Sequence, residues 1–226
     1  MYTLHYAPDN ASLIIRLVLD TAGIAYQTTL VDRAVRAQDS AAYRRLNPAG
    51  LIPTLETPHG AISETGAILL WLGDTHHLAP PSDHPTHLPF LQWLFFLANT
   101  VHADLRQLFY PQLYVPTDAT PGHHALLSAR MIRHFTLLDS AAADHPGLFT
   151  AQGLLLPYTA ALMRWSALYP ANAPRWFSLS TYPTLAVLLA HLDATPAART
   201  VAMAEGLGPL PFSAPILPRP PEGTAL

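Results

Sequence analysis

Hydrophobic and polar residues alternate near the start of the chain and take helical spacing soon afterwards. Residues 2–7 alternate and are rich in β-forming side chains, which predicts a first strand. Apolar residues at helical spacing between Ala11 and Ala22 predict a helix that Gly23 ends. Residues 26–31 predict a second strand. The chain therefore begins with the strand–helix–strand order of an α/β domain.

The next stretch predicts a short helix, a strand pair and a further helix. Residues 39–46 have the pattern of a short helix, and strands are expected at residues 51–55 and 61–62. His59-Gly60 is the expected turn between these strands. A helix is expected over residues 64–72, so the predicted α/β domain spans residues 1–75.

Beyond residue 75 the pattern predicts only helices. Several prolines mark residues 76–89 as a linker, and residues 90–208 form the second domain, which is all-helical. Pro157 stands at the first turn of one predicted helix, where proline is well tolerated. The expected helices span residues 90–109, 122–143, 158–168, 182–192 and 196–204, and a proline-rich extended tail covers residues 209–226. The fold class is thus α+β with two domains.

Composition narrows the function classes. Of 226 residues, 50% are hydrophobic and 12% charged, the formal net charge is -3, and all twelve basic residues are arginines. No basic run is present, so we expect no nucleic-acid partner. Proline or polar residues break every long apolar run, and the N-terminus has no charged leader, so we expect no membrane partner and no signal peptide. The absence of cysteine favours a cytoplasmic protein and excludes thiol chemistry by its own side chains.

The run Asn47-Pro48-Ala49-Gly50-Leu51-Ile52-Pro53-Thr54-Leu55 combines a turn signal with a proline at a strand entry. Proline cannot donate a hydrogen bond inside a sheet, so Pro53 belongs at the start of the strand. We expect the Ile52–Pro53 bond to be cis and to turn the backbone there. Ile52 then presents its N–H and C=O to a group outside the sheet.

The run Ser63-Glu64-Thr65-Gly66-Ala67-Ile68 has the pattern of a helix start. Hydroxyl and acidic side chains favour that position, because a helix N-terminus has free N–H groups and a partial positive charge. The same groups bind carboxylates. Each feature alone is also explained more simply, Thr65 or Ser63 as a helix cap and Pro53 as a strand-edge proline.

Taken together and in this order, the two runs resemble the glutathione-binding domain of the cytosolic-type glutathione transferases, and the C-terminal helices resemble bacterial members. The resemblance implies a thioredoxin-like α/β domain followed by an all-helical domain. It implies that Ile52, before the cis Pro53, pairs its backbone with the cysteinyl part of glutathione. Glu64 and Thr65 then hold the γ-glutamyl end.

The resemblance also suggests a partner for the sulfur. Residues 7–12 are similar to the run that carries the catalytic cysteine of the beta class, but Ala11 stands at the cysteine position. Ser12 is the first candidate for the sulfur partner and Asn10 the second, with Tyr6 weaker. The alternative is that Ser12 only caps the first helix.

Two further sites follow from the resemblance. The position that holds the glycine carboxylate of glutathione falls near Asp39, which would repel it, so Gln38 or Arg36 is expected to substitute. The acceptor-substrate pocket should lie against the helix after the linker, where His102 is a candidate proton donor or polar anchor. Its other expected walls are Tyr110, Trp165 and Tyr169. A buried core role is the alternative for His102 and Trp165.

Together these features favour the hypothesis that the protein is an enzyme. It is expected to conjugate glutathione thiolate to a small hydrophobic electrophile, as in detoxification. It uses glutathione as co-substrate and no other cofactor, and it is expected to be a homodimer in the cytoplasm. No histidine cluster has metal-ligand spacing, so no metal is expected. The alternative is a non-catalytic ligand-binding or interaction protein on the same fold, which the missing cysteine and Asp39 favour.

Overall fold

A four-stranded sheet organises the first third of the chain. The computed structural model describes residues 1–225. Its strands are β1 (Tyr2–Tyr6), β2 (Tyr26–Leu30), β3 (Thr54–Thr57) and β4 (Gly60–Ser63), in the order β2-β1-β3-β4. β1 runs parallel to β2 and antiparallel to β3, and β3 and β4 form an antiparallel hairpin. This is the sheet of a thioredoxin-like domain, so the predicted fold class is confirmed for this part.

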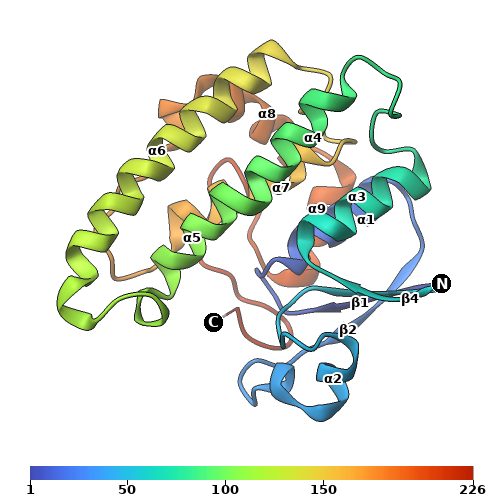
Figure 1. Ribbon diagram of the computed structural model, residues 1–226, viewed down its shortest axis with the longest axis horizontal. Helices are drawn as coiled ribbons and strands as arrows, with labels where there is room; N and C mark the ends of the chain where they lie inside the picture. Colours follow the sequence, from blue (N-terminus) through green and yellow to red (C-terminus); the bar gives the residue numbers. More distant parts are fainter. Residues whose placement is uncertain (226) are drawn as a thin grey trace.

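The two faces of the sheet are covered by different helices, as Figure 1 shows. Helices α1 (Ser12–Thr21) and α3 (Thr65–His76) pack together on one face, and α2 (Ala41–Leu46) lies on the other. The alternation along β1 explains this division. Tyr6 points toward Arg16 of α1, while the ring of His5 lies 5.8 Å from the ring of Tyr43 in α2.

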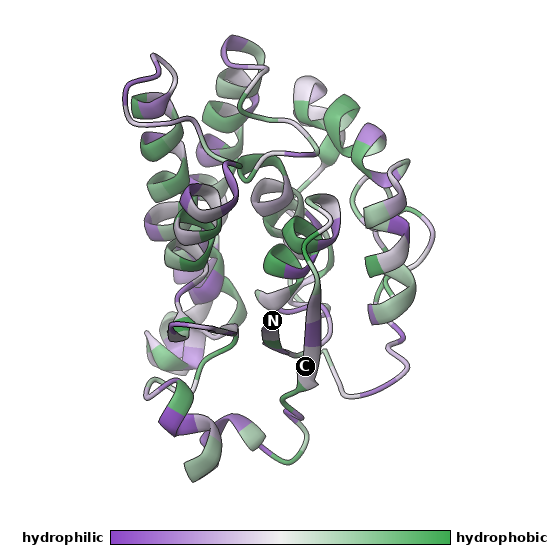
Figure 2. Ribbon diagram, turned by 90° about the vertical axis from the view of Figure 1, so that its right-hand side faces the viewer, coloured by the Kyte–Doolittle hydropathy of each residue, from purple (hydrophilic) through white to green (hydrophobic). Residues whose placement is uncertain are grey.

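The remainder of the chain is helical. Green and purple turns are mixed along most of these helices in Figure 2, as expected for helices with one buried face. The helices are α4 (His87–Phe96), α5 (His102–Phe109), α6 (Thr120–Asp144), α7 (Leu155–Leu168), α8 (Pro183–Asp193) and α9 (Pro196–Glu205). A π-helical turn joins α4 to α5 over Leu97–Val101, and short 3-10 turns occupy Ala37–Asp39, Pro111–Leu113, Thr117–Ala119 and Leu179–Thr181.

Helix α7 is the centre of the helical domain and is buried along almost its whole length. Helix α1 of the α/β domain packs against α7 and α9, so the two domains share a core. The start of α1, and the loop that precedes it, are therefore fixed by both domains.

The observed helices differ from the predicted ones mainly at their ends. α3 continues to His76, α4 already begins at His87, and α7 begins at Leu155 rather than after Pro157. In α7 the added residues Leu155 and Leu156 are buried apolar side chains, so packing extends this helix beyond the proline signal in the sequence. The predicted helix over residues 90–109 is interrupted by the π turn. The predicted domain boundaries stay a prediction.

The segment after α9 has no helix or strand but is attached to the core. The N–H of Arg219 donates to the carbonyl of Gly206 at 2.8 Å. The carboxylate of Asp193 accepts from the N–H groups of Phe212, at 3.0 Å, and Ser213, at 2.9 Å. Within residues 1–225, no helix has the length and apolar character needed to cross a membrane.

Candidate functional site

Ile52, two residues before β3, leaves its backbone groups open. The Ile52–Pro53 bond is cis, which confirms the prediction from sequence. The carbonyl of Leu51 is held by the Tyr43 hydroxyl at 2.6 Å and by the Asn47 amide at 2.7 Å. The N–H and C=O of Ile52 have no hydrogen-bond partner in the described part of the chain. The loop is thus fixed on one side while Ile52 is left open on the other.

The start of α3 is also open. Glu64 is exposed and adopts φ 70° and ψ 115°, a backbone conformation that costs a non-glycine residue roughly 1–3 kcal/mol. No side chain caps the first turn of α3. The Thr65 hydroxyl has no hydrogen-bond partner among residues 1–225, although the residue is largely buried. Free N–H groups, the helix dipole and this hydroxyl together form a site for a carboxylate.

The hairpin brings these two open features together. Thr54 of β3 is paired with Ser63 of β4. Ile52 and Pro53 precede Thr54, and Glu64 and Thr65 follow Ser63, so both pairs leave the same end of the hairpin. The sequence predicted these residues, and the structure brings them to one edge of the sheet.

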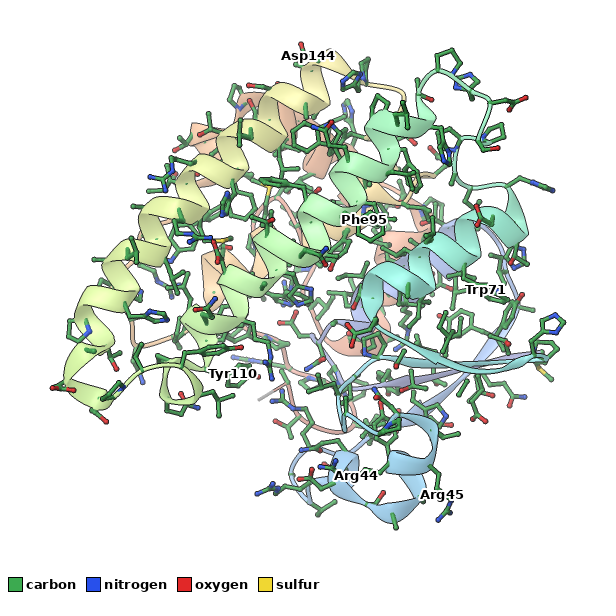
Figure 3. All side chains as sticks on the ribbon, in the orientation of Figure 1. Arg44, Arg45, Trp71, Phe95, Tyr110 and Asp144 are labelled. Atoms are coloured by element: carbon green, nitrogen blue, oxygen red, sulfur yellow. The ribbon has the colours of Figure 1, made fainter. Side chains whose placement is uncertain are left out.

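The region before α2 differs from the sequence expectation. Asp39 does not stand alone, because it accepts from Arg36 at 2.8 Å and from Arg44 at 2.7 Å. The two arginines, Arg36 first, lower the pKa of the Asp39 carboxyl. Asp39 is thus paired with two cations rather than standing as a free anion, and its effect on the glycine carboxylate of glutathione stays a prediction. Figure 3 shows Arg44 on α2, and the Oε1 atom of Gln38 is buried without a partner among the described residues.

The loop after β1 corrects the first candidate for a thiol partner. Ser12 is fully buried, its hydroxyl donates to the carbonyl of Ala7 at 3.0 Å, and it accepts from the Ala7 N–H at 3.2 Å. A hydroxyl that closes a turn in this way has no proton left for a bound sulfur. The Oδ1 of Asn10 accepts from the Ala11 N–H at 2.8 Å, and the amide protons of Asn10 have no partner within residues 1–225. Asn10 is half-buried.

Asp9 holds this loop against the helical domain. Its carboxylate and the Arg164 guanidinium are both fully buried and form a two-pronged ion pair, with Nε–Oδ1 at 2.8 Å and Nη2–Oδ2 at 3.1 Å. Trp165 donates to Asp9 at 2.7 Å and Tyr169 at 2.8 Å. Trp165 and Tyr169 were predicted as pocket walls. They are instead buried beneath the loop, and both donate their hydrogen bonds to Asp9. Burial, and then the negative charge of Asp9, raise the pKa of the Tyr169 hydroxyl.

A second buried acid supports the same loop. Glu205 of α9 accepts from the Asp9 N–H at 2.9 Å and from Arg16 at 3.3 Å. Burial raises the pKa of the Glu205 carboxyl to about 7, against the opposing effect of Arg16. The loop backbone is therefore tied to α1 and α9 as well as to α7.

The remaining predicted pocket residues lie along α5. His102 Nδ1 is 2.9 Å from the Tyr158 hydroxyl, and burial lowers the pKa of the His102 ring to about 4, so it is neutral at pH 7. The Tyr110 hydroxyl accepts from Arg33 at 3.1 Å. His102 and Tyr110 therefore both have partners within the chain, and these partners, Tyr158 and Arg33, were not predicted.

Sequence reasoning missed Asp9, Arg164 and Glu205. Arg164 carries a signal, because it is the one charged residue in Leu155–Leu168. A charge in a buried helix requires a buried partner. Nothing in the sequence identifies Asp9 as that partner. Within the described residues, no group of three or more histidine or acidic side chains is arranged to hold a metal ion.

Comparisons with known proteins agree with this arrangement. Residues 11–75 match the family model of the glutathione S-transferase N-terminal domain. The chain is 30% identical over 119 residues to glutathione S-transferase GST-4.5 of Xanthomonas campestris pv. campestris, a match that covers 51% of this chain and 57% of the relative. The chain thus spans little more than half the length of that curated relative.

Solved structures extend the likeness to both domains. The glutathione S-transferase from Xylella fastidiosa aligns with a TM-score of 0.78 at 19% identity, over 92% of this chain and 100% of that one. A sphingomonad glutathione S-transferase, solved in complex with glutathione, aligns with a TM-score of 0.72 at 24% identity, over 91% and 100% of the two chains. Residues 11–75 of this chain are thus similar to the glutathione S-transferase N-terminal domain, and the whole chain has the fold of the solved glutathione transferases.

Proposed function

We propose that the protein binds glutathione at the edge formed by Ile52, Glu64 and Thr65 and conjugates its thiolate to a small hydrophobic electrophile. The observation that carries the proposal is the set of unpaired groups at one end of the β3–β4 hairpin. Unpaired backbone groups and a strained acidic residue persist where a ligand completes them.

Each part of glutathione has a matching group. The backbone of Ile52 pairs with the cysteinyl residue, whose peptide offers one donor and one acceptor. The start of α3 and the Thr65 hydroxyl hold the γ-glutamyl carboxylate, and Glu64 receives the ammonium. Gln38 and the arginines that flank Asp39 attract the glycine carboxylate.

The sulfur then lies toward the loop after β1, where Asn10 is the donor we assign to it. A free thiol has a pKa near 8.5, so only a small fraction is ionised at neutral pH. One hydrogen bond to a charged group contributes roughly 1.5–3 kcal/mol. That equals roughly one to two pKa units, enough to make the thiolate a major species at pH 7.

The protein is proposed to work as a cytoplasmic homodimer with no metal or cofactor beyond glutathione as co-substrate. Support for a second copy comes from α4, which leaves Leu88 75% and Phe95 50% exposed. Figure 3 labels Phe95 on this helix. Large apolar side chains grouped on one helix favour a protein partner.

Calorimetric titration with reduced glutathione tests binding. Thr65→Ala should weaken the affinity about tenfold or more, because a hydrogen bond to a charged group is lost. Ser63→Ala, next to it and also without a side-chain hydrogen bond, is the matched control and should bind as the wild type does. No heat at millimolar glutathione would overturn the proposal.

Conjugation is tested with 1-chloro-2,4-dinitrobenzene and with the ultraviolet band of bound thiolate. Asn10→Ala should raise the pH midpoint of that band and slow conjugation, while Ser12→Ala should leave the midpoint unchanged. Glutathione binding without a thiolate shift or any turnover would instead identify a non-catalytic binding protein. The engaged hydroxyl of Ser12 is the observation that favours this second function.

A further inference from the structure

Residues 222–225 lie against the end of β1 and the loop after it, the side of the proposed site to which we assign the sulfur. Glu222 accepts a hydrogen bond from the Tyr6 hydroxyl. The carbonyl of Ala225 accepts from Arg33 at 2.6 Å. In Figure 1 the red segment near the end of the chain lies at the left-hand end of the sheet.

These contacts bridge the two elements expected to enclose an electrophile. Gly223 lies against Pro8, just before the loop that carries Asn10. Arg33, which holds Ala225, also donates to Tyr110 at the end of α5 at 3.1 Å. The segment Glu222–Ala225 therefore fills the space between the loop after β1 and the end of α5.

The fit of this segment is close. Gly223 has φ +70°, and a Cβ added there would come within 2.8 Å of Leu30 and 3.3 Å of Pro8. Only glycine satisfies both the backbone conformation and the space. Burial and the bond to Glu222 raise the pKa of the Tyr6 hydroxyl to about 12, so this donor keeps its proton throughout the physiological range.

The tail before this segment is fastened independently. Arg164 donates to the carbonyls of Pro211 at 2.9 Å and Ile216 at 3.1 Å, and the Arg219 N–H bonds to Gly206. Loss of residues after Pro221 leaves all of these bonds in place. The segment Glu222–Ala225 is thus able to leave its seat without release of the rest of the tail.

We propose that the segment Glu222–Ala225 determines acceptor specificity, as a cover over the outer part of the pocket that bulky groups on the sulfur must displace. The inference rests on the proposed function. Glutathione itself, and small electrophiles, fit beneath the cover because their groups bind at Ile52, Glu64 and Thr65. Large apolar electrophiles and their conjugates compete with the segment Glu222–Ala225 for this space.

Calorimetry with glutathione, S-methylglutathione and S-hexylglutathione tests this, on the full chain and on a chain that ends at Pro221. The shortened chain should bind S-hexylglutathione about tenfold more tightly than the full chain, a gain of about 1.4 kcal/mol. Both chains should bind glutathione and S-methylglutathione equally. In conjugation assays, the shortened chain should show a higher kcat/KM for bulky acceptors relative to small ones.

Two full-length variants guard against an effect of truncation on folding. Gly223→Ala, which clashes with Leu30, should reproduce the tighter binding of S-hexylglutathione. Leu217→Ala, at an exposed site in the same tail, should behave as the wild type.

The outcomes separate the two claims. If the full chain, the shortened chain and Gly223→Ala all bind glutathione and all bind S-hexylglutathione equally well, the proposed cover is wrong and the proposed function stands. Failure of every form to bind glutathione would overturn the proposed function and the cover with it.

Discussion

The two sides of the proposed site differ in how far the chain satisfies its own polar groups. On the glutathione side, the backbone of Ile52, the Thr65 hydroxyl and the start of α3 have no partners within residues 1–225. On the sulfur side, Asp9, Ser12 and Tyr6 all form hydrogen bonds inside the protein. The first side, around Ile52 and Thr65, has unpaired groups and is called the open side. The second, around Asp9, Ser12 and Tyr6, has its groups paired within the chain and is called the closed side.

The difference shows how stability is divided within one site. The open side keeps a strained residue and unpaired donors that only a ligand relieves, so it lowers stability in exchange for affinity. On the closed side, the buried ion pair between Asp9 and Arg164 of α7 fixes the loop that carries Asn10. Changes on the first side are therefore expected to alter binding, and changes on the second to alter stability.

The largest effect is expected on the closed side. Arg164→Met leaves the Asp9 carboxylate buried without its cation, which costs roughly 3–5 kcal/mol. Arg199→Met, at an exposed arginine of α9, should cost almost nothing. Urea unfolding followed by circular dichroism measures both, and a loss near zero for Arg164→Met would contradict the structural role of the closed side.

The next effect is a pH dependence set by Glu205. Its pKa is raised in the folded protein from 4.5 to about 7, so the folded chain keeps a proton that the unfolded chain releases in that range. The unfolding free energy of the wild type relative to Glu205→Gln should therefore fall as pH rises from about 4.5 to 7, by roughly 3 kcal/mol, and level off above it. His102, whose pKa is lowered, acts in the opposite direction but is present in both proteins and cancels.

A rise in that difference across the same pH range would show that Glu205 stays ionised in the folded protein. Denaturant titrations at half-unit pH steps give the measurement, and Asp83→Asn, at an exposed acid with no hydrogen bond or ion pair among the described residues, serves as the control.

A smaller and opposite effect is expected on the open side. Glu64→Gly relieves the positive φ and should raise the unfolding free energy by about 1 kcal/mol. The same change should weaken glutathione binding, because the acceptor for its ammonium is lost. Thermal unfolding and calorimetry on one sample test the pair of outcomes. If Glu64→Gly is less stable than the wild type and binds glutathione equally tightly, Glu64 has a structural role and does not bind the ligand.

The smallest effect is expected at Asp39. Asp39→Asn removes one carboxylate between Arg36 and Arg44, so the attraction of the glycine carboxylate increases. Because these groups are near the surface and screened by salt, the glutathione affinity should rise by less than about threefold and the gain should shrink at high ionic strength. Weaker binding would mean that Asp39 orients the arginines and that this arrangement matters more than its charge.

The residues of the open side could be predicted from sequence because the patterns that mark them lie within short stretches of the chain. The Ile52–Pro53 bond and the start of α3 follow from short runs whose residue types have few backbone solutions. Hydrophobic periodicity gave an α/β order and the long helices, while the finer assignment of the sheet came from the family resemblance. Periodicity missed the π turn and the extra turns at the end of α3 and the start of α7.

The closed side was not readable because its contacts join distant residues. Asp9 and Arg164 are 155 positions apart, and Tyr6 and Glu222 are 216 apart. Ser12 has the residue type and position of a sulfur ligand, but the fold of the β1–α1 turn commits its hydroxyl to Ala7. The pattern in the tail predicted its lack of regular structure and gave no indication of where it docks.

Amide hydrogen exchange with and without saturating glutathione tests the contrast between the two sides most directly. We expect glutathione to protect the amides of Ile52 and of residues 65–67 from exchange, because these donors are unpaired in the free protein. The amide of Asp9, already bonded to Glu205, should exchange slowly in both states and change little. Protection gained at Asp9 while Ile52 and the start of α3 stay unchanged would contradict the account.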